Sequence, residues 1–439
     1  MSKRTQRNFK IEDPKIFKQK IFSWMQQFET AIWLDSNNYE QKYSSFDCAI
    51  AVDEFTSIKT DYHNAFDKLK EYQSYTKDYI FGYISYDVKN DTEKLSSNNF
   101  DGLHFPDLYF FQPQKLIFIK GNIVEFHYLQ MIDDELEEDF EEIIEAIPIY
   151  NRVQENNSPE ESDIKIKLRI HKDEYHEKVT KVLEHIHRGD IYEANFCQEF
   201  YAENTIINPY EVYTHLNEIS EPPFATFFKH ENLHLLSATP ERYIKKEETK
   251  IISQPIKGTA KRLISQIEDK KIAFDLARDE KERSENIMIV DLVRNDLSRT
   301  AIKGSVQVEE LCKVYSFKQV HQMISTVTSE VAVTTHPVDV IKDTFPMGSM
   351  TGAPKISAMK IIEELEETKR GLYSGTVGYF TPDGNFDFNV VIRSILYNSD
   401  EKYVSYSVGG AITAKSTPEK EYEECLLKAK AMKYVLLNN

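Results

Sequence analysis

The sequence has few cysteines and no long apolar run. Its 439 residues include four cysteines, and no two of them form a CxxC pair. So few thiols in a chain of this length indicate reduced cysteines in a cytosolic protein, not a disulfide framework. No run approaches the ~20 apolar residues of a membrane span. The basic N-terminus lacks the apolar stretch of a secretory signal. We therefore expect a soluble cytoplasmic protein with no membrane partner.

Basic residues are also fewer than acidic residues. The chain has 54 Lys and Arg against 72 Asp and Glu, a net charge of −18. Nucleic-acid binding draws on clustered basic residues, so nucleic acid is not expected as a partner. Hydrophobic residues make up 41% and charged residues 29%, the balance of a soluble globular protein. An anionic substrate would need a metal ion or buried basic groups to offset the acidic surroundings.

Periodicity divides the chain into two regions. Residues 151–163 are polar and aperiodic, which predicts a linker over 151–164 between an N-terminal region, 1–150, and a catalytic region, 165–439. Short strands and a hairpin at Gly121-Asn122 are expected in the first region. The second mixes helices with hairpin-linked strands, which favours an α+β fold of antiparallel sheets with helices outside. The expected helices are 136–147, 287–297 and 353–368, and the expected strands are 79–86, 115–119, 123–129, 373–381, 386–397 and 402–413.

Two pairs of glutamates are spaced for one helix face each. Glu282 and Glu285 are three residues apart, as are Glu421 and Glu424, and residues at this spacing are neighbours on a helix. Mg²⁺ prefers oxygen ligands and often takes one or two carboxylates together with a substrate anion. Two such pairs could therefore face one Mg²⁺. Taken alone, each pair is more typical of a solvated helix face.

A lysine and a glycine pair mark two further segments. Lys257 lies between a proline and a glycine after an apolar stretch, in QPIKGT. Burial there would lower the pKa of its amine and free it for attack, although a surface loop lysine is the commoner reading of such a stretch. Gly409 and Gly410 are expected at a strand end, where bare backbone N–H groups can approach an anion.

Arg393 stands in an apolar run that reads as a strand. A buried guanidinium needs a partner, and a carboxylate held bidentately suits it best. That carboxylate could belong to a substrate or to an internal salt bridge, and the sequence leaves both open.

Ordered motifs across residues 165–435 resemble the chorismate-utilising enzymes, which include anthranilate synthase component I, aminodeoxychorismate synthase component I and the isochorismate and salicylate synthases. The matching segments are GDIYEANFCQEF, ATPERY, QPIKGTAKR, ERSENIMIVDLVRNDLSR, VHQMIST, FPMGSMTGAPKISAMKIIEELE, YSGTVGYFTPDG, VIRSI and GGAIT with the TPEKEYEE that follows. The resemblance implies the anthranilate synthase component I-like fold. Its N-terminal part is carried by AIWLDSN and GYISYD.

The residue at position 257 separates members of this family. The aminodeoxychorismate-forming members carry Pro-Ile-Lys-Gly-Thr, with the lysine as nucleophile, where anthranilate synthases usually have alanine. The isomerising and salicylate-forming members carry a lysine in the GDIYEANF region, where this chain has Glu193. The resemblance therefore implies amination of chorismate at C4, with anthranilate synthesis as the alternative. A catalytically silent scaffold protein is a third reading, which the full set of motif residues disfavours.

The resemblance also implies roles for individual residues. Lys257 is the implied nucleophile and Glu241 the implied general acid. Glu285 and Glu424 are the implied direct ligands of Mg²⁺, with Glu282 and Glu421 completing the shell. The residues implied to bind substrate are Arg393, Gly409, Gly410, Tyr373, Tyr379, His321, Thr351 and Lys428.

The source of ammonia is expected to lie outside this chain. A glutaminase needs a cysteine nucleophile with a histidine partner, and none of the four cysteines lies in such a motif. A separate glutamine amidotransferase subunit, or free ammonia, is therefore the expected source.

Overall fold

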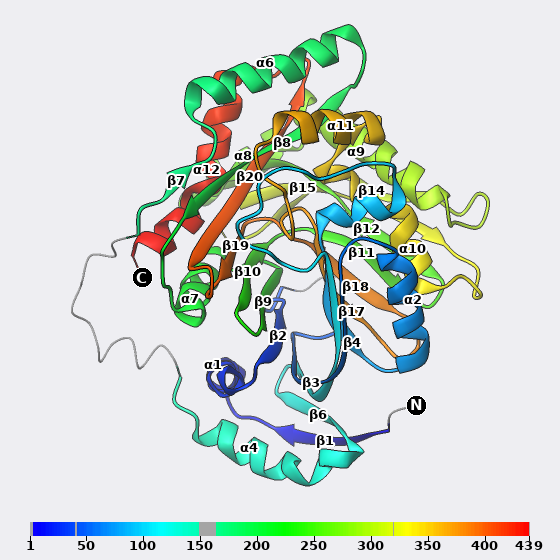
Figure 1. Cartoon of the computed structure of the whole chain (residues 1–439), viewed down its shortest axis with the longest axis vertical. Coiled ribbons are helices and arrows are strands. Elements are labelled where there is room, and N and C mark those ends of the chain that lie inside the picture. Colours follow the sequence, from blue (N-terminus) through cyan, green and yellow to red (C-terminus); the bar gives the residue numbers. More distant parts are fainter. Residues whose placement is uncertain (1–2, 40–41, 149–163, 319, 439) are drawn as a thin grey trace.

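The computed structural model describes residues 3–39, 42–148, 164–318 and 320–438. It has an α+β fold, and all the strand pairings between its named strands are antiparallel, which confirms the expected fold class (Figure 1). The predicted linker lies outside the described residues except for Ile164. In the described part of the chain no helix is long and apolar enough to cross a membrane.

The described part of the N-terminal region contributes six strands. The hairpin predicted at Gly121-Asn122 is confirmed, because Lys120 pairs with Ile123 and Gly121 has a positive φ of 57°. The elements are β1 (Arg4–Lys10), α1 (Pro14–Trp24), η1 (Met25–Gln27), β2 (Thr30–Asp35), β3 (Cys48–Thr60), α2 (Ala65–Thr76), β4 (Ile80–Ile84), η2 (Tyr86–Val88), α3 (Lys89–Thr92), β5 (Leu108–Lys120), β6 (Ile123–Leu129), η3 (Gln130–Glu135) and α4 (Leu136–Glu145).

The C-terminal region contributes the remaining strands and the longer helices. Its elements are β7 (Lys167–Leu168), α6 (Lys172–Arg188), β8 (Glu193–Ala202), α7 (Pro209–Ser220), β9 (Phe224–His230), β10 (Leu233–Thr239), β11 (Arg242–Glu247), β12 (Lys250–Gln254), β13 (Ile256–Lys261), α8 (Gln266–Leu276), α9 (Glu280–Ser298), β14 (Gln307–Ser316), β15 (Val320–Glu330), α10 (Pro337–Thr344), η4 (Gly348–Met350), β16 (Gly352–Ala353), α11 (Lys355–Leu365), β17 (Thr376–Phe380), β18 (Phe386–Val390), β19 (Ser394–Asn398), β20 (Tyr403–Thr413) and α12 (Pro418–Leu437).

The sheet divides into two branches at β5, which pairs with both β3 and β4. The first branch continues from β3 through β2, β9, β10, β19 and β20 to β8. The second continues from β4 through β17, β18, β11 and β12 to β15, which also pairs with β13 and β14. Strands of the two regions thus share one sheet, through β2–β9 and β4–β17.

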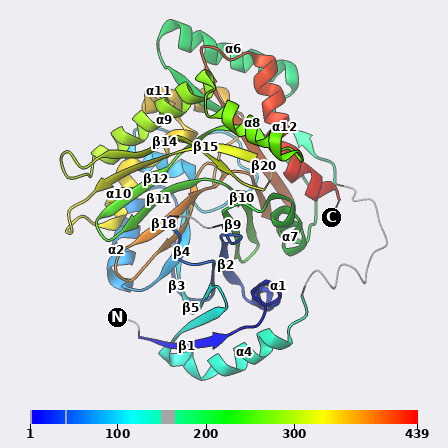
Figure 2. The same cartoon turned by 180° about the vertical axis from the view of Figure 1, so that it is seen from behind.

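Apolar side chains from both branches form the largest core cluster, which includes Phe110, Phe228 and Phe388. A second cluster lies under α1, α7 and α12. Figures 1 and 2 show the helices on the outside of the strands, with α12 beside β20 and α9 beside β14 and β15. Burial of apolar surface on both sides of the strands is the main stabilising term of such a layered fold.

One predicted strand is broken. Residues 386–397 were expected to form one strand, but β18 ends at Val390 and β19 begins at Ser394. Arg393 lies in the break, not in a strand, and has a left-handed φ of 53°. The break could not be predicted from the apolar sequence, because hydrophobic periodicity does not depend on the backbone conformation of a single residue.

Candidate active site

The chain crosses between the two branches of the sheet at two neighbouring points. Glu241 lies between β10 of the first branch and β11 of the second, and Arg393 lies between β18 and β19. Backbone hydrogen bonds hold the crossings together, from Ala238 N–H to Arg393 O (3.1 Å) and from Val390 N–H to Glu241 O (3.0 Å). The fold therefore places these two charged side chains where the branches meet.

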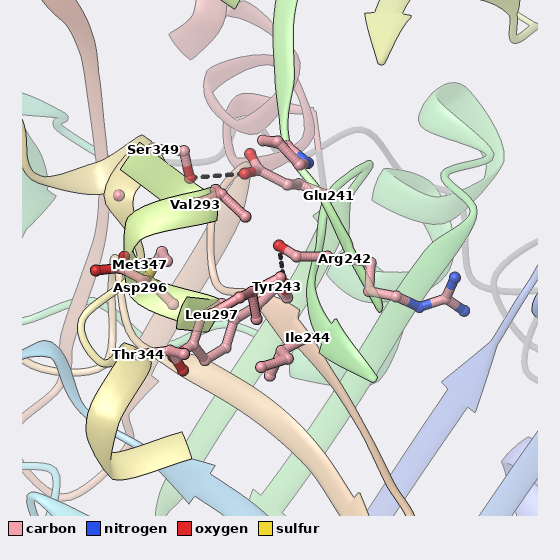
Figure 3. A pocket seen from close by; sticks show the side chains of 13 residues that line it. Glu241, Arg242, Tyr243, Ile244, Val293, Asp296, Leu297, Thr344, Met347 and Ser349 are labelled. Atoms are coloured by element: carbon pink, nitrogen blue, oxygen red, sulfur yellow. Dashed lines mark hydrogen bonds between the residues drawn. The ribbon is translucent and has the colours of Figure 1, made fainter. Parts of the chain in front are cut away.

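Glu241 is a buried carboxyl group with one strong donor. It is 5% exposed, and the Ser349 hydroxyl donates to its Oε1 at 2.6 Å (Figure 3). Burial raises the pKa of Glu241 to about 7, against the lowering effects of Ser349 and of the charge of Lys257. A carboxylic acid that is partly protonated near neutrality can serve as a general acid, as the resemblance implied. A cavity bounded by Glu241, Ser349, Asp296 and Met347 adjoins it.

Lys257 is the second residue of β13 and is half-buried. The α9 helix is fastened to this strand by Asn286, whose side-chain amide donates to Lys257 O and to Met323 O, both at 3.3 Å. Gly258, with φ +92°, allows this close packing: a Cβ atom there would lie 3.2 Å from Glu282 Oε2. The Lys-Gly pair thus brings the lysine strand directly against the helix that carries Glu282.

The four predicted ligand glutamates come together. Glu282 and Glu285 lie on α9, and Glu421 and Glu424 lie on α12. The charges of all four act on Lys281, whose Nζ is 3.8 Å from Glu285 Oε1. The carboxylates of both helices therefore lie within electrostatic reach of one lysine.

Their electrostatics suit a cation. Burial, together with the charges of neighbouring carboxylates, raises the pKa of Glu282 and of Glu421. Burial also opposes ionisation of Glu424. This effect is outweighed by the positive charges of Lys428, Lys257 and Lys281, which lower the pKa of Glu424. Among the described residues no three acidic, His or Cys side chains are arranged closely enough to form a ready metal cage. The oxygen-only donor set and its surplus negative charge nonetheless fit Mg²⁺.

Gly409 and Gly410 lie within β20, not at its end as expected, and each permits a close approach. A Cβ atom at Gly409 would lie 2.4 Å from Phe196 O of β8, and one at Gly410 would lie 3.3 Å from Glu421 Oε2. Lys428 Nζ donates to Gly409 O at 2.8 Å and pairs with Glu424 Oε1 at 2.7 Å. Lys428 thus links β20, which carries the two glycines, to α12, which carries Glu421 and Glu424.

Arg393 has no carboxylate partner within the described residues: no ion pair or side-chain hydrogen bond involves its guanidinium there. Burial lowers its pKa, while Tyr373 and Glu424 act in the opposite direction. An internal salt bridge, one of the two readings open from the sequence, is therefore not what holds this cation. Tyr373 is buried beside it, with its hydroxyl 3.6 Å from Cys197 Sγ.

Three more of the predicted substrate-binding residues have clear partners in the structure. Tyr379 lines a separate cavity with Phe46, Arg242 and Asp387, and its ring stacks on Phe81 at 5.4 Å.

The His321 ring nitrogens lie 3.0 Å from Asp269 Oδ1 and 2.8 Å from Ser316 Oγ. The Thr351 hydroxyl donates to the backbone oxygens of Met347 and Gly348.

A buried arginine that the sequence analysis missed supports the site. Arg370 donates to Glu366 through Nε (2.9 Å) and Nη2 (2.6 Å), to Met350 O (2.6 Å) and to Asn195 O (2.7 Å). Glu366 Oε1 in turn accepts the Cys197 N–H at 2.9 Å. This network holds β8 against the segment before Thr351. Ser349 was contained in a matched motif, but nothing in the sequence pattern singled out Arg370.

Comparison with known proteins identifies the class. The family described as chorismate binding enzyme matches residues 29–434, so the chain belongs to this family and is a chorismate-utilising enzyme. It is 34% identical to anthranilate synthase component 1 of Aquifex aeolicus over 80% of this chain and 73% of that one. It is 41% identical to aminodeoxychorismate synthase component 1 of Escherichia coli over 58% of this chain and 55% of that one.

Solved structures agree on the fold. Anthranilate synthase component I of Streptococcus pneumoniae superposes with a TM-score of 0.73 at 25% identity, covering 90% of this chain and 93% of that one. The menaquinone-specific isochorismate synthase of Escherichia coli gives 0.74 at 14% identity, over 99% and 95%.

Proposed function

We propose that this chain is the chorismate-aminating component of an aminodeoxychorismate synthase, an amino-group transferase that makes 4-amino-4-deoxychorismate for 4-aminobenzoate and folate synthesis. The observation that carries the proposal is the position of Lys257. Its charge acts on the buried acid Glu241 and on the ligand-helix glutamate Glu424. An amine, an acid and a proposed magnesium ligand therefore lie within electrostatic reach of one another.

Amination proceeds in two displacements. The free amine of Lys257 forms a bond to C2 of chorismate as both ring double bonds shift and the C4–O bond breaks. Glu241 gives its proton to the departing oxygen, so that water leaves instead of hydroxide. Ammonia then bonds to C4 while the C2–N bond breaks and its electron pair returns to Lys257. Two allylic steps replace one difficult direct substitution.

The two carboxylates of the substrate require separate cations. Arg393, which has no carboxylate partner in the described chain, would hold the pyruvyl carboxylate beside Tyr373 and the Gly409-Gly410 backbone, with Lys428 close by. Mg²⁺ bound by Glu285 and Glu424, with Glu282 and Glu421 around it, would fix the ring carboxylate and draw electron density from the ring. These groups offset the acidic charge of the chain locally.

Ammonia would come from a separate glutamine amidotransferase subunit. The four cysteines are buried within the described residues. Burial raises the pKa of Cys197 to about 12 and that of Cys425 to about 11, which does not suit a thiolate nucleophile at neutral pH. The chain itself is thus not suited to release ammonia from glutamine.

The test is the product formed from chorismate, ammonium chloride and Mg²⁺. We expect a product that becomes 4-aminobenzoate only after aminodeoxychorismate lyase is added, and no intrinsic anthranilate fluorescence. Lys257→Ala should abolish this product while the melting temperature stays within a few degrees. Formation of anthranilate by the wild-type enzyme would instead establish anthranilate synthase activity, and undiminished product from Lys257→Ala would refute the nucleophile.

A further inference from the structure

The hydroxyl group that contacts Glu241 stands on a short irregular segment. Ser349 is the middle residue of η4, a single turn of three residues, and Thr351 after it belongs to no helix or strand. One turn leaves most of its carbonyl groups without a partner inside the turn, and buried carbonyl groups need partners. The position of the Ser349 hydroxyl therefore depends on whatever holds this backbone.

Three successive carbonyl groups of the segment are held from outside it. Asn195 of β8 donates from Nδ2 to Ser349 O at 3.0 Å and from its backbone N–H to Thr351 O at 2.7 Å. Arg370, which follows α11, donates from Nη1 to Met350 O at 2.6 Å. Both donor residues are buried, and hydrogen bonds are electrostatically stronger there than in water. They fix the backbone that carries the hydroxyl.

The two donor residues are themselves held in place. Arg370 Nη2 donates to Asn195 O at 2.7 Å. The same guanidinium is paired with Glu366 at 2.6 Å and lies 4.5 Å from the centre of the Tyr86 ring in the N-terminal region. Asn195 Oδ1 accepts a hydrogen bond from the Cys197 thiol at 3.1 Å. Both ends of the Asn195 carboxamide are thus engaged inside the protein.

The Ser349 hydroxyl acts on Glu241 before and after proton transfer. It donates to Oε1 at 2.6 Å (Figure 3), which favours the proton of the neutral acid on Oε2, the oxygen then free to protonate the departing hydroxyl group. After the proton has left, the same hydrogen bond stabilises the carboxylate, and a hydrogen bond to a charged group is stronger than one to a neutral group. Its loss should therefore lower kcat more than it changes substrate affinity.

We propose that Asn195 and Arg370 are positioning residues for the general acid. They hold the carbonyl groups of η4 so that the Ser349 hydroxyl stays directed at Glu241. This assignment rests on the proposed function. Because both residues act through one hydroxyl group, their effect on the reaction should disappear when that hydroxyl is absent.

The experiment is a double-mutant cycle of Asn195→Ala with Ser349→Ala, read as the rate of chorismate consumption with saturating ammonium chloride and Mg²⁺. Alanine at position 195 removes the side-chain donor and keeps the backbone hydrogen bonds of β8. We expect kcat to fall about 10-fold, the lower range for a hydrogen bond to a charged group. The KM for chorismate should change less than about twofold. In the Ser349→Ala protein, Asn195→Ala should change kcat less than about twofold.

A matched control separates this role from loss of stability. Asn398 of β19 is also buried and donates from Nδ2 to a backbone carbonyl, that of Leu103, at 2.9 Å. Asn398→Ala should lower the melting temperature and leave kcat within about twofold of wild type, because its hydrogen bonds do not reach η4.

A second variant tests the other donor residue and serves if Asn195→Ala does not fold. Arg370→Lys keeps a positive charge for Glu366 but lacks the planar fork that reaches two backbone carbonyl groups at once. It should lower kcat about threefold or more when Ser349 is present and less than about twofold in the Ser349→Ala protein.

An unchanged kcat for Asn195→Ala, or an equally large fall in the Ser349→Ala protein, would overturn the positioning role. A rise in the KM for chorismate in place of a fall in kcat would do the same, because it would show a substrate contact. The proposed function is judged separately, by the product of the wild type. A wild type that makes anthranilate refutes the proposed function while the cycle still decides the positioning role, and a wild type that consumes no chorismate refutes both.

Discussion

Replacing Glu241 with glutamine should make the protein more stable at alkaline pH and far less active. Burial raises the pKa of Glu241 from an ordinary 4.5 to about 7. A group whose pKa is raised by folding favours the folded state below the unfolded pKa, and this contribution is lost as pH rises through the folded pKa. Ionised Glu241 therefore destabilises the wild-type protein at pH 8, and neutral glutamine does not.

The size of the effect follows from the shift. The difference between 4.5 and about 7, at about 1.4 kcal/mol per pKa unit, corresponds to roughly 3 kcal/mol between pH 4.5 and 8. Glutamine keeps an oxygen that can accept the Ser349 hydrogen bond, so packing should change little. The loss of the proton donor should lower kcat at least about 100-fold, the lower end of general acid catalysis.

The assay is urea unfolding of both proteins at pH 5, 6, 7 and 8, with kcat measured alongside. The free energy of unfolding of Glu241→Gln, relative to wild type, should increase by about 2.5 kcal/mol between pH 5 and pH 8. The wild-type kcat/KM should fall above pH 7. A stability difference that is the same at every pH would refute the assignment of a raised pKa to this carboxyl group.

Three further substitutions test neighbouring contacts. Ser349→Ala removes the hydrogen bond that lowers the pKa of Glu241, so the alkaline fall of kcat/KM should move to higher pH; a fall at the wild-type pH would contradict this. Glu285→Gln should raise the Mg²⁺ concentration for half-maximal activity about tenfold or more, and an identical titration curve would rule out this ligand. Arg393→Lys should raise the KM for chorismate about 10-fold or more because bidentate binding is lost, with an unchanged KM as the contrary result.

The amino-acid sequence predicts much of the local structure. Alternating apolar residues located β6 at Ile123–Leu129, and the i, i+3 glutamate pairs located one face each of α9 and α12. These features depend on short-range periodicity, which a sequence states directly. The break around Arg393 is different, because one residue with a positive φ leaves no mark on an apolar run.

Side-chain partners from distant segments were harder to predict. His321 matched a motif, but its contact with Asp269 of α8 joins residues 52 positions apart. Tyr379 and Tyr373 lie in one motif, yet only Tyr373 acts on Arg393, because Tyr379 belongs to β17 and lines another cavity. Which face of a strand reaches the site is decided by the pairing of distant strands.

The bond between Lys257 and the substrate is the most direct test of the mechanism. Enzyme mixed with chorismate and Mg²⁺ in the absence of ammonia, quenched in acid within milliseconds to seconds and digested, can be examined by mass spectrometry. We expect the peptide that contains Lys257 to gain the mass of chorismate less one water, and Lys257→Ala to show no such gain. Rapid amination on later addition of ammonia, with no adduct on this lysine at any quench time, would contradict the covalent mechanism.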